Sequence, residues 1–131
     1  MTKVPCLWPL LCCLLLCGCG SKLASVEGTV TLDGKPLSTG TVVFQNEGLP
    51  MGVGGLSSNG SYTIYTGDQP GLPPGDYQVT VSAYQTRPGR DEMEEPIPVL
   101  LTPPRYNKPE TSGLTAKVTP GSNRFDFKLE P

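Results

Sequence analysis

The chain has 131 residues, a length typical of one domain, and a formal net charge of −2, which provides no basic surface for nucleic acid. Histidine is absent, and this excludes a Ser-His-Asp triad, a histidine-ligated zinc ion and an imidazole general base. The 16 glycines and 15 prolines are spread between apolar runs, as turns are in a domain of short strands.

The N-terminal segment resembles the signal peptide of a bacterial lipoprotein. Lys3 supplies one positive charge, and residues 10–17 are continuously apolar but too few to span a bilayer core, which needs about 20 residues. Leu16-Cys17-Gly18-Cys19 resembles a lipobox, in which an aliphatic residue and two small residues precede the cysteine that receives lipid. The sequence therefore predicts a signal peptide over 1–18, cleavage before Cys19 and a lipidated tether over 19–23. An uncleaved short anchor and an ordinary secretory signal are the alternatives.

Cleavage before Cys19 changes the meaning of the cysteine count. The other cysteines would leave with the signal peptide: Cys6, Cys12, Cys13 and Cys17. The thiol of Cys19 would then carry lipid, with acyl chains such as palmitate, so that no disulfide and no cysteine metal site is expected. We expect the lipid to hold the protein on the cell membrane or the outer membrane, facing the periplasm or the exterior.

Residues 24–32 alternate between apolar and polar side chains, which predicts a half-buried strand. Asp33-Gly34 follows at once and is a strong hairpin signal. A second apolar run occupies residues 41–45, and the two runs are expected to face each other across that connection. Gly28 within the first strand indicates close backbone packing or a bulge, and Gly34 and Gly60 are expected at turn positions with positive φ.

Further strands are predicted at 52–56, 61–66, 76–84, 115–119 and 123–129. About seven short strands without a helical period favour an all-β fold, a single antiparallel β-sandwich of the transthyretin-like or immunoglobulin-like kind, over residues 24–131. Tyr77 is expected to be a buried ring with its hydroxyl bonded to nearby backbone. The predicted core consists of Val26, Val30, Val42, Phe44, Tyr62, Ile64, Tyr77, Val79, Val81, Phe125 and Phe127.

The segment 85–113 breaks this rhythm. It is rich in proline and contains the acidic run Asp91-Glu92-Met93-Glu94-Glu95. We expect a long Pro-rich loop here, and structureless connections of this length are often functional or disordered.

Several motifs resemble those of carboxypeptidase regulatory-like domains, which have a transthyretin-like sandwich. Residues 26–37 (VEGTVTLDGKPL) are similar to the opening V-x-G-x-V-x-x-x-G-x-P-L of that family. Asn59-Gly60-Ser61-Tyr62 resembles its D-G-x-Y/F turn, with Asn in place of Asp, and residues 74–79 (PGDYQV) resemble its P-G-x-Y-x-V segment. The tail, from Pro104 through Phe127, is similar to small lipoproteins of planctomycete-type bacteria. The resemblance implies a fold more than a function, because these motifs consist of turn and core residues.

Few side chains suggest a ligand site. The acidic run could bind Ca²⁺, but adjacent carboxylates are more typical of a solvated loop than of a calcium loop, so no metal site is predicted. Tyr65, Tyr84 and Tyr106 are candidates for stacking on sugar rings. The arginines near the acidic run are expected to form an internal set of ion pairs with it: Arg87, Arg90 and Arg105.

These observations favour a non-catalytic, lipid-anchored cell-envelope protein with a binding or accessory role. A surface carbohydrate-binding module and a purely structural envelope protein are the alternatives. An enzyme is not expected, because the related hydroxyisourate hydrolases depend on histidines that this chain lacks. No cofactor is expected. The expected partners are the membrane, through lipid on Cys19, and an envelope protein or a glycan.

Overall fold

The computed structural model describes residues 23–131. The predicted signal peptide and Cys19 therefore lie outside the described residues. Within the described part, no helix is long and apolar enough to cross a membrane.

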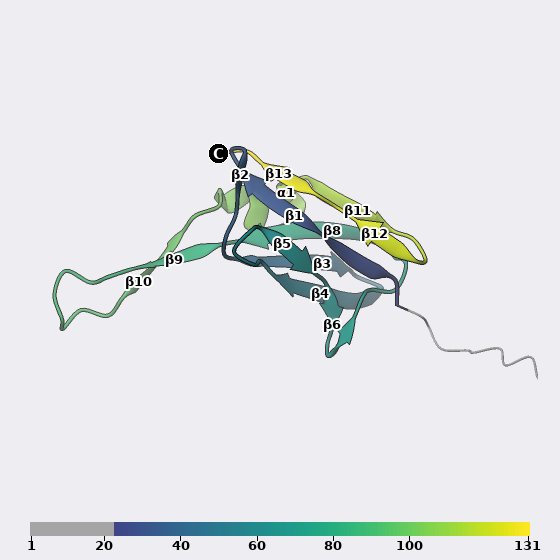
Figure 1. Ribbon diagram of the computed structural model, residues 1–131, viewed down its shortest axis with the longest axis horizontal. Helices are drawn as coiled ribbons and strands as arrows, with labels where there is room; N and C mark the ends of the chain where they lie inside the picture. Colours follow the sequence, from purple (N-terminus) through teal and green to yellow (C-terminus); the bar gives the residue numbers. More distant parts are fainter. Residues whose placement is uncertain (1–22) are drawn as a thin grey trace, which may run out of the picture.

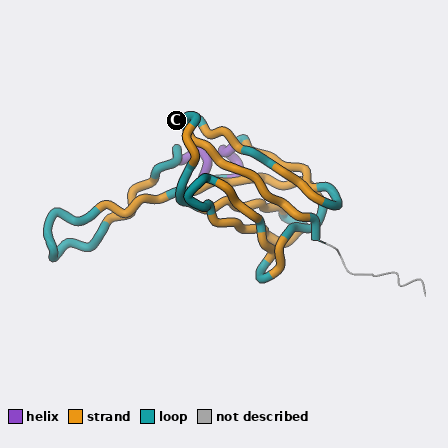
Figure 2. Tube along the Cα trace, in the orientation of Figure 1, coloured by secondary structure: helices purple, strands orange, loops and turns teal. Residues whose placement is uncertain are grey.

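Two β-sheets pack face to face, as Figures 1 and 2 show. In the first sheet, β1 (Ser25–Leu32) is central. On one side it pairs with β12 (Ser122–Arg124) and β13 (Phe127–Leu129), and on the other with β2 (Lys35–Pro36) and β5 (Ser61–Thr63). The second sheet has six strands in the order β11-β8-β3-β4-β6-β7. Their bounds are β3 (Thr41–Asn46), β4 (Leu49–Gly55), β6 (Tyr65–Thr66), β7 (Gln69–Pro70), β8 (Gly75–Ser82) and β11 (Leu114–Val118).

The predicted all-β sandwich is confirmed, with one departure from an antiparallel arrangement. β1 pairs in parallel with β12 and β13. The physical reason is that the chain crosses from β11 in the second sheet to β12 in the first. β12 is therefore not joined to its neighbour β1 by a hairpin, which would have made the pair antiparallel. The predicted strand over 123–129 is also divided between β12 and β13.

The Asp33-Gly34 turn has the two positive φ angles, 52° and 79°, of a tight hairpin turn. It joins β1 to the short strand β2. The two apolar runs expected to face each other across this turn are β1 and β3. They lie in opposite sheets, and their side chains meet in the core.

The core is centred on Phe44, whose ring centroid lies 5.9–6.3 Å from four other aromatic rings. These are Tyr62, Tyr77, Phe125 and Phe127, so the central ring joins both sheets. Every predicted core residue is buried except Phe125, which is partly buried. Edge-to-face and tilted ring pairs of this kind add stability beyond the area that they bury.

The predicted strand over 61–66 changes sheets at Ile64, which is fully buried. β5 before it pairs with β1, whereas β6 after it pairs with β4. Glycines of β4 allow this crossing. A Cβ at Gly52 would lie 2.5 Å from Ile64 Cγ2, and one at Gly54 would lie 2.5 Å from the Thr63 carbonyl oxygen.

The backbone at Gly28 packs against the backbone at Phe125, which confirms the close backbone packing that a glycine within this strand predicts. A Cβ at Gly28 would lie 1.8 Å from the Phe125 carbonyl oxygen. That oxygen accepts a hydrogen bond from the Tyr62 hydroxyl at 2.5 Å. The predicted bond of Tyr77 is also present, because its hydroxyl donates to the Pro73 carbonyl oxygen at 2.6 Å.

The expectation of one long loop over 85–113 is wrong. The segment contains the hairpin of β9 (Tyr84–Arg87) and β10 (Ile97–Leu100), followed by the 3₁₀ helix η1 (Pro104–Asn107) and the helix α1 (Pro109–Ser112). Pro104 and Pro109 begin the two short helices, where the missing N–H of proline costs nothing. Two of the prolines that suggested a loop therefore mark the starts of single helical turns, and Pro98 lies within β10.

Candidate functional site

The exposed large hydrophobic side chains of the described residues fall into two groups. The first group lies on the outer face of the second sheet: Met51, Val53 and Tyr65. The second group lies between residues 84 and 99: Tyr84, Met93, Ile97 and Val99. Clustered exposed apolar side chains often mark interaction sites, whereas single ones need no explanation. We call these surfaces the outer face and the arm.

The outer face is assembled by strand register. Val43 on β3 is opposite Val53 on β4, and Val53 is opposite Tyr65 on β6, which produces an apolar row across three strands. Beside this row, Gln45 on β3 is opposite Gln78 on β8. Cross-strand partners project to the same side of a sheet, so the two amides are neighbours on this face.

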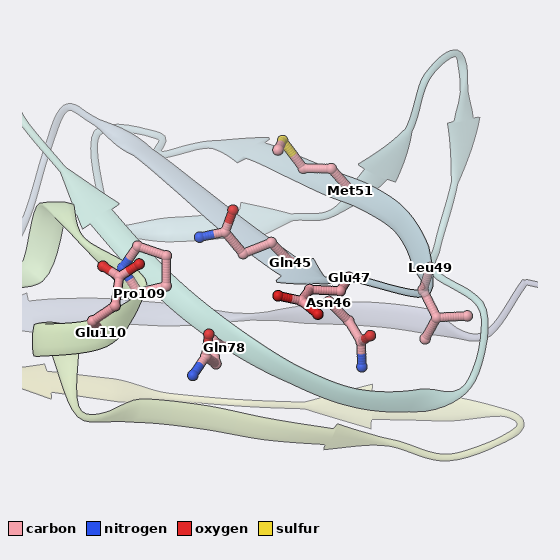
Figure 3. Close-up of a pocket in the computed structure, with 8 residues that line it drawn as sticks. All are labelled: Gln45, Asn46, Glu47, Leu49, Met51, Gln78, Pro109 and Glu110. Atoms are coloured by element: carbon pink, nitrogen blue, oxygen red, sulfur yellow. The ribbon is translucent and has the colours of Figure 1, made fainter.

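A groove of about 310 Å³ borders these amides. Figure 3 shows Gln45 lying between Met51 on one side and Pro109 and Glu110 of α1 on the other. The helix is fixed beside the groove because the Ser112 hydroxyl donates a 2.6 Å hydrogen bond to the Val79 carbonyl oxygen of β8. The β3–β4 turn closes one end with Asn46, Glu47 and Leu49.

The groove residues differ in how their polar atoms are used. The Asn46 side-chain amide donates to the Asp76 carbonyl oxygen, and its oxygen accepts from the Gly48 amide at 2.9 Å. Within residues 23–131, the side chains of Gln45, Gln78 and Glu110 make no hydrogen bond or ion pair. These groups therefore remain available to a ligand.

The arm is the β9–β10 hairpin with its connecting loop. Every residue from Tyr84 to Val99 is exposed except Gly89, which is half-buried. Figure 1 shows the hairpin extending from the sandwich at the left. Among the described strands, β9 and β10 pair with each other and with no strand of the two large sheets. An isolated two-stranded hairpin has little stability of its own, and its edges offer unpaired backbone groups.

The acidic run forms the loop of the arm. The Met93 amide donates to Asp91 Oδ1 at 2.9 Å, and the Arg90 amide donates to Glu94 Oε2 at 2.8 Å. The expected ion pairs between the arginines and this run are not formed. Among residues 23–131, the ion pair that is present joins Arg124 to Asp126, at 3.3 Å. No group of three or more potential metal-ligating side chains is present between residues 23 and 131.

The three candidate tyrosines do not form one site. Tyr65 is 45% exposed on the outer face, and Tyr84 is 53% exposed on the arm. Tyr106 is buried, contrary to its proposed role in stacking on a sugar. Its hydroxyl accepts hydrogen bonds from the Glu130 amide and the Arg105 guanidinium, both at 3.0 Å, and so fixes η1 to the residue that follows β13.

Arg105 is also part of this structural contact. Its guanidinium carbon lies 4.7 Å from the centroid of the Tyr106 ring, and the same group donates to the Glu130 carbonyl oxygen at 2.9 Å. The sequence pattern did not reveal that Arg105 and Tyr106 are structural residues, because the hydrogen bond from Arg105 to Glu130 joins residues 25 positions apart.

The groups with shifted pKa values lie away from both surfaces. Burial, followed by the nearby Asp126 charge, raises the pKa of Tyr62, and burial raises the pKa of Tyr77. Burial opposes ionisation of Asp126, but hydrogen bonds from the Thr29 amide and hydroxyl and the Arg124 charge outweigh it and lower the pKa of that carboxyl. These shifts accompany structural contacts of the sandwich.

No family model matches this chain, and no curated protein matches it. A solved structure to which it is similar is the crystal structure of a 9R-lipoxygenase from Cyanothece PCC8801, with 19% identity and a TM-score of 0.38. That similarity covers 85% of this chain and 17% of the lipoxygenase chain, so this chain spans a small part of that enzyme. A TM-score this low supports no statement about the fold or the function of this chain.

Proposed function

We propose that this chain is a non-catalytic, lipid-anchored protein of the cell envelope that binds another envelope protein through the arm. The lipobox-like Leu16-Cys17-Gly18-Cys19 supports the anchor. The observation that carries the binding role is the position of the arm, at the end of the sandwich opposite the start of the described chain (Figure 1).

The order of the strands explains why the arm and the start of the described chain lie at opposite ends of the sandwich. Ala24 exchanges two backbone hydrogen bonds with Leu72, at 2.7 and 2.8 Å, so the N-terminal end of the domain lies close to the residues that precede β8. β8 then runs from Gly75 to Ser82, and at about 3.3 Å per residue it ends roughly 25 Å away. The arm begins there, at Tyr84. A lipid on Cys19 would therefore present the arm away from the membrane.

The arm has the properties of a protein-docking element. It exposes Ile97 and Val99 on one face and Tyr84 on the other face of a narrow hairpin that buries none of its residues. A partner that covers Ile97 and Val99 can also add an extended strand along an open hairpin edge, where main-chain hydrogen bonds supply affinity. Exposed apolar side chains on both strands are costly in isolation, and a partner that covers them offsets that cost.

Site-specific photo-cross-linking in intact cells tests the arm. We expect a cross-linker at Ile97 or Val99, which share one face of the hairpin, to produce the same discrete adduct, whereas one at Lys128, an exposed residue on β13, does not. Adducts that are equal at all three positions, or no adduct at Ile97 and Val99, would contradict the docking role. The second result would favour the purely structural envelope protein.

The anchor is tested separately. We expect radiolabelled palmitate to be incorporated into the full-length chain and to be lost in Cys19→Ser. Incorporation that persists in Cys19→Ser would refute lipidation at this residue, whatever the arm binds.

A carbohydrate-binding role is the second candidate. The observation that favours it is the outer face, where the exposed Tyr65 ring continues a row that borders the groove. Of the three tyrosines, Tyr65 is the one on the face that carries the groove, two strands away from Gln45.

A further inference from the structure

We infer that the groove on the outer face is a binding site for a neutral glycan, held by Gln45, Gln78 and Glu110. The site is independent of the arm, and this inference rests on the carbohydrate-binding role given above as the second candidate, to which it assigns residues and a ligand class. Its starting point is the pair of amides at the centre of the second sheet, which are cross-strand partners and make no hydrogen bond within residues 23–131.

The polar groups of the groove select the chemistry of the ligand. Each glutamine amide offers two donor hydrogens and an acceptor oxygen, and the Glu110 carboxylate adds acceptors. Hydroxyl groups on neighbouring carbons of a sugar both donate and accept, so they can satisfy such a set at close spacing. The lining contains Glu47 and Glu110 and no Lys or Arg, which disfavours anionic ligands such as phosphates and acidic sugars.

The position of the groove disfavours an extended peptide. β3 pairs with β4 and β8 on its two sides, and β8 pairs with β3 and β11. Their backbone groups are therefore used within the sheet, and a peptide strand cannot be added there, since strand addition requires a free sheet edge. A ligand on this face must be held by side chains, which suits a compact ring that carries its own donors and acceptors.

The apolar row supplies a second contact. Met51 lines the groove, and Val53 and Tyr65 continue from it across β4 and β6. Strands are spaced at about 4.8 Å, and Gln45 lies two residues along β3 from Val43, which is level with Tyr65, so the Tyr65 position lies roughly 12 Å from that of Gln45. A short oligosaccharide can span this distance and place the C–H face of one ring against the electron-rich face of Tyr65. The exposure of this ring, 45%, leaves it accessible.

Isothermal titration calorimetry on the full-length chain in a detergent without a sugar headgroup tests the site. The neutral probes are cellotriose and triacetylchitotriose, and trigalacturonate is the anionic probe. We expect saturable binding of at least one neutral probe at millimolar concentration and none of trigalacturonate. Because one hydrogen bond to a neutral group is lost, Gln45→Ala and Gln78→Ala should each weaken that binding about three- to tenfold.

Matched variants on the arm control for unspecific effects. Gln85→Ala and Tyr84→Ala should leave the affinity for the neutral probe unchanged, whereas Tyr65→Ala should weaken it. The proposal is overturned if neither neutral probe binds, if trigalacturonate alone binds, or if Gln45→Ala and Gln78→Ala bind as the unaltered chain does. Melting curves of each variant establish that the domain remains folded. The arm cross-links should persist in Gln78→Ala, so failure of this site and failure of the docking role are distinguishable.

Discussion

Replacement of Gly28 by alanine should destabilise the sandwich more than any surface substitution. The added Cβ would lie 1.8 Å from the Phe125 carbonyl oxygen and 2.9 Å from the Tyr62 hydroxyl. Real Cβ contacts are not shorter than 3.0 Å, so the backbones must separate by roughly 1 Å. No rotamer change relieves the clash, because the closest atom belongs to the backbone.

The expected cost has two parts. Overpacking of a close contact costs about 1–3 kcal/mol, and weakening of the bond from Tyr62 to Phe125 costs about 1 kcal/mol more. The free energy of unfolding should therefore fall by about 2–4 kcal/mol. For a domain of this size, that corresponds to a decrease in melting temperature of about 10–30 °C.

Thermal and urea denaturation, followed by circular dichroism, measure this change in the full-length chain. Gly55→Ala is the matched control, since a Cβ at that position on β4 would meet nothing within 4 Å. The control should lie within about 0.5 kcal/mol of the unaltered chain. A Gly28→Ala variant as stable as Gly55→Ala would refute the close packing of β1 against the segment between β12 and β13.

Two further predictions concern single polar contacts. Tyr77→Phe removes the 2.6 Å hydrogen bond to Pro73 and should lower the free energy of unfolding by about 1 kcal/mol in urea denaturation, whereas Tyr84→Phe should change nothing. Asp126 has a pKa below its ordinary value of 3.8 in the folded state, so its contacts with Thr29 stabilise the fold above that value and are lost as the pH falls through the lowered pKa. The urea midpoint of the unaltered chain should approach that of Asp126→Asn as the pH falls from neutral to well below 3.8, and an unchanged difference would contradict this linkage.

The strands and the core could be predicted because their signals are local. Alternation over 24–32 and 76–84 marks one buried face per strand, and Asp33-Gly34 encodes a tight turn in two residues. The helical turns at Pro104 and Pro109 could not be predicted in this way, because one turn is too short to show a period.

The candidate site was less predictable than the fold. Exposure of Tyr65 follows from its alternation with the buried Ile64, which is a local pattern. Tyr106 carries no such pattern, and its burial depends on contacts with Arg105 and Glu130. Gln45 and Gln78 have no common sequence motif, and they meet because β3 and β8 pair in one register.

By itself, the sequence determined the all-β class, the turns and most of the residues that face the core, because side-chain alternation and turn chemistry act between near neighbours. Tertiary structure alone decided which strands pair. It moved the chain between sheets at Ile64, placed β12 and β13 parallel to β1, and joined two distant glutamines beside α1. The physical reason is that a strand pattern specifies a buried face and not a partner, whereas pairing is chosen by packing across the whole core.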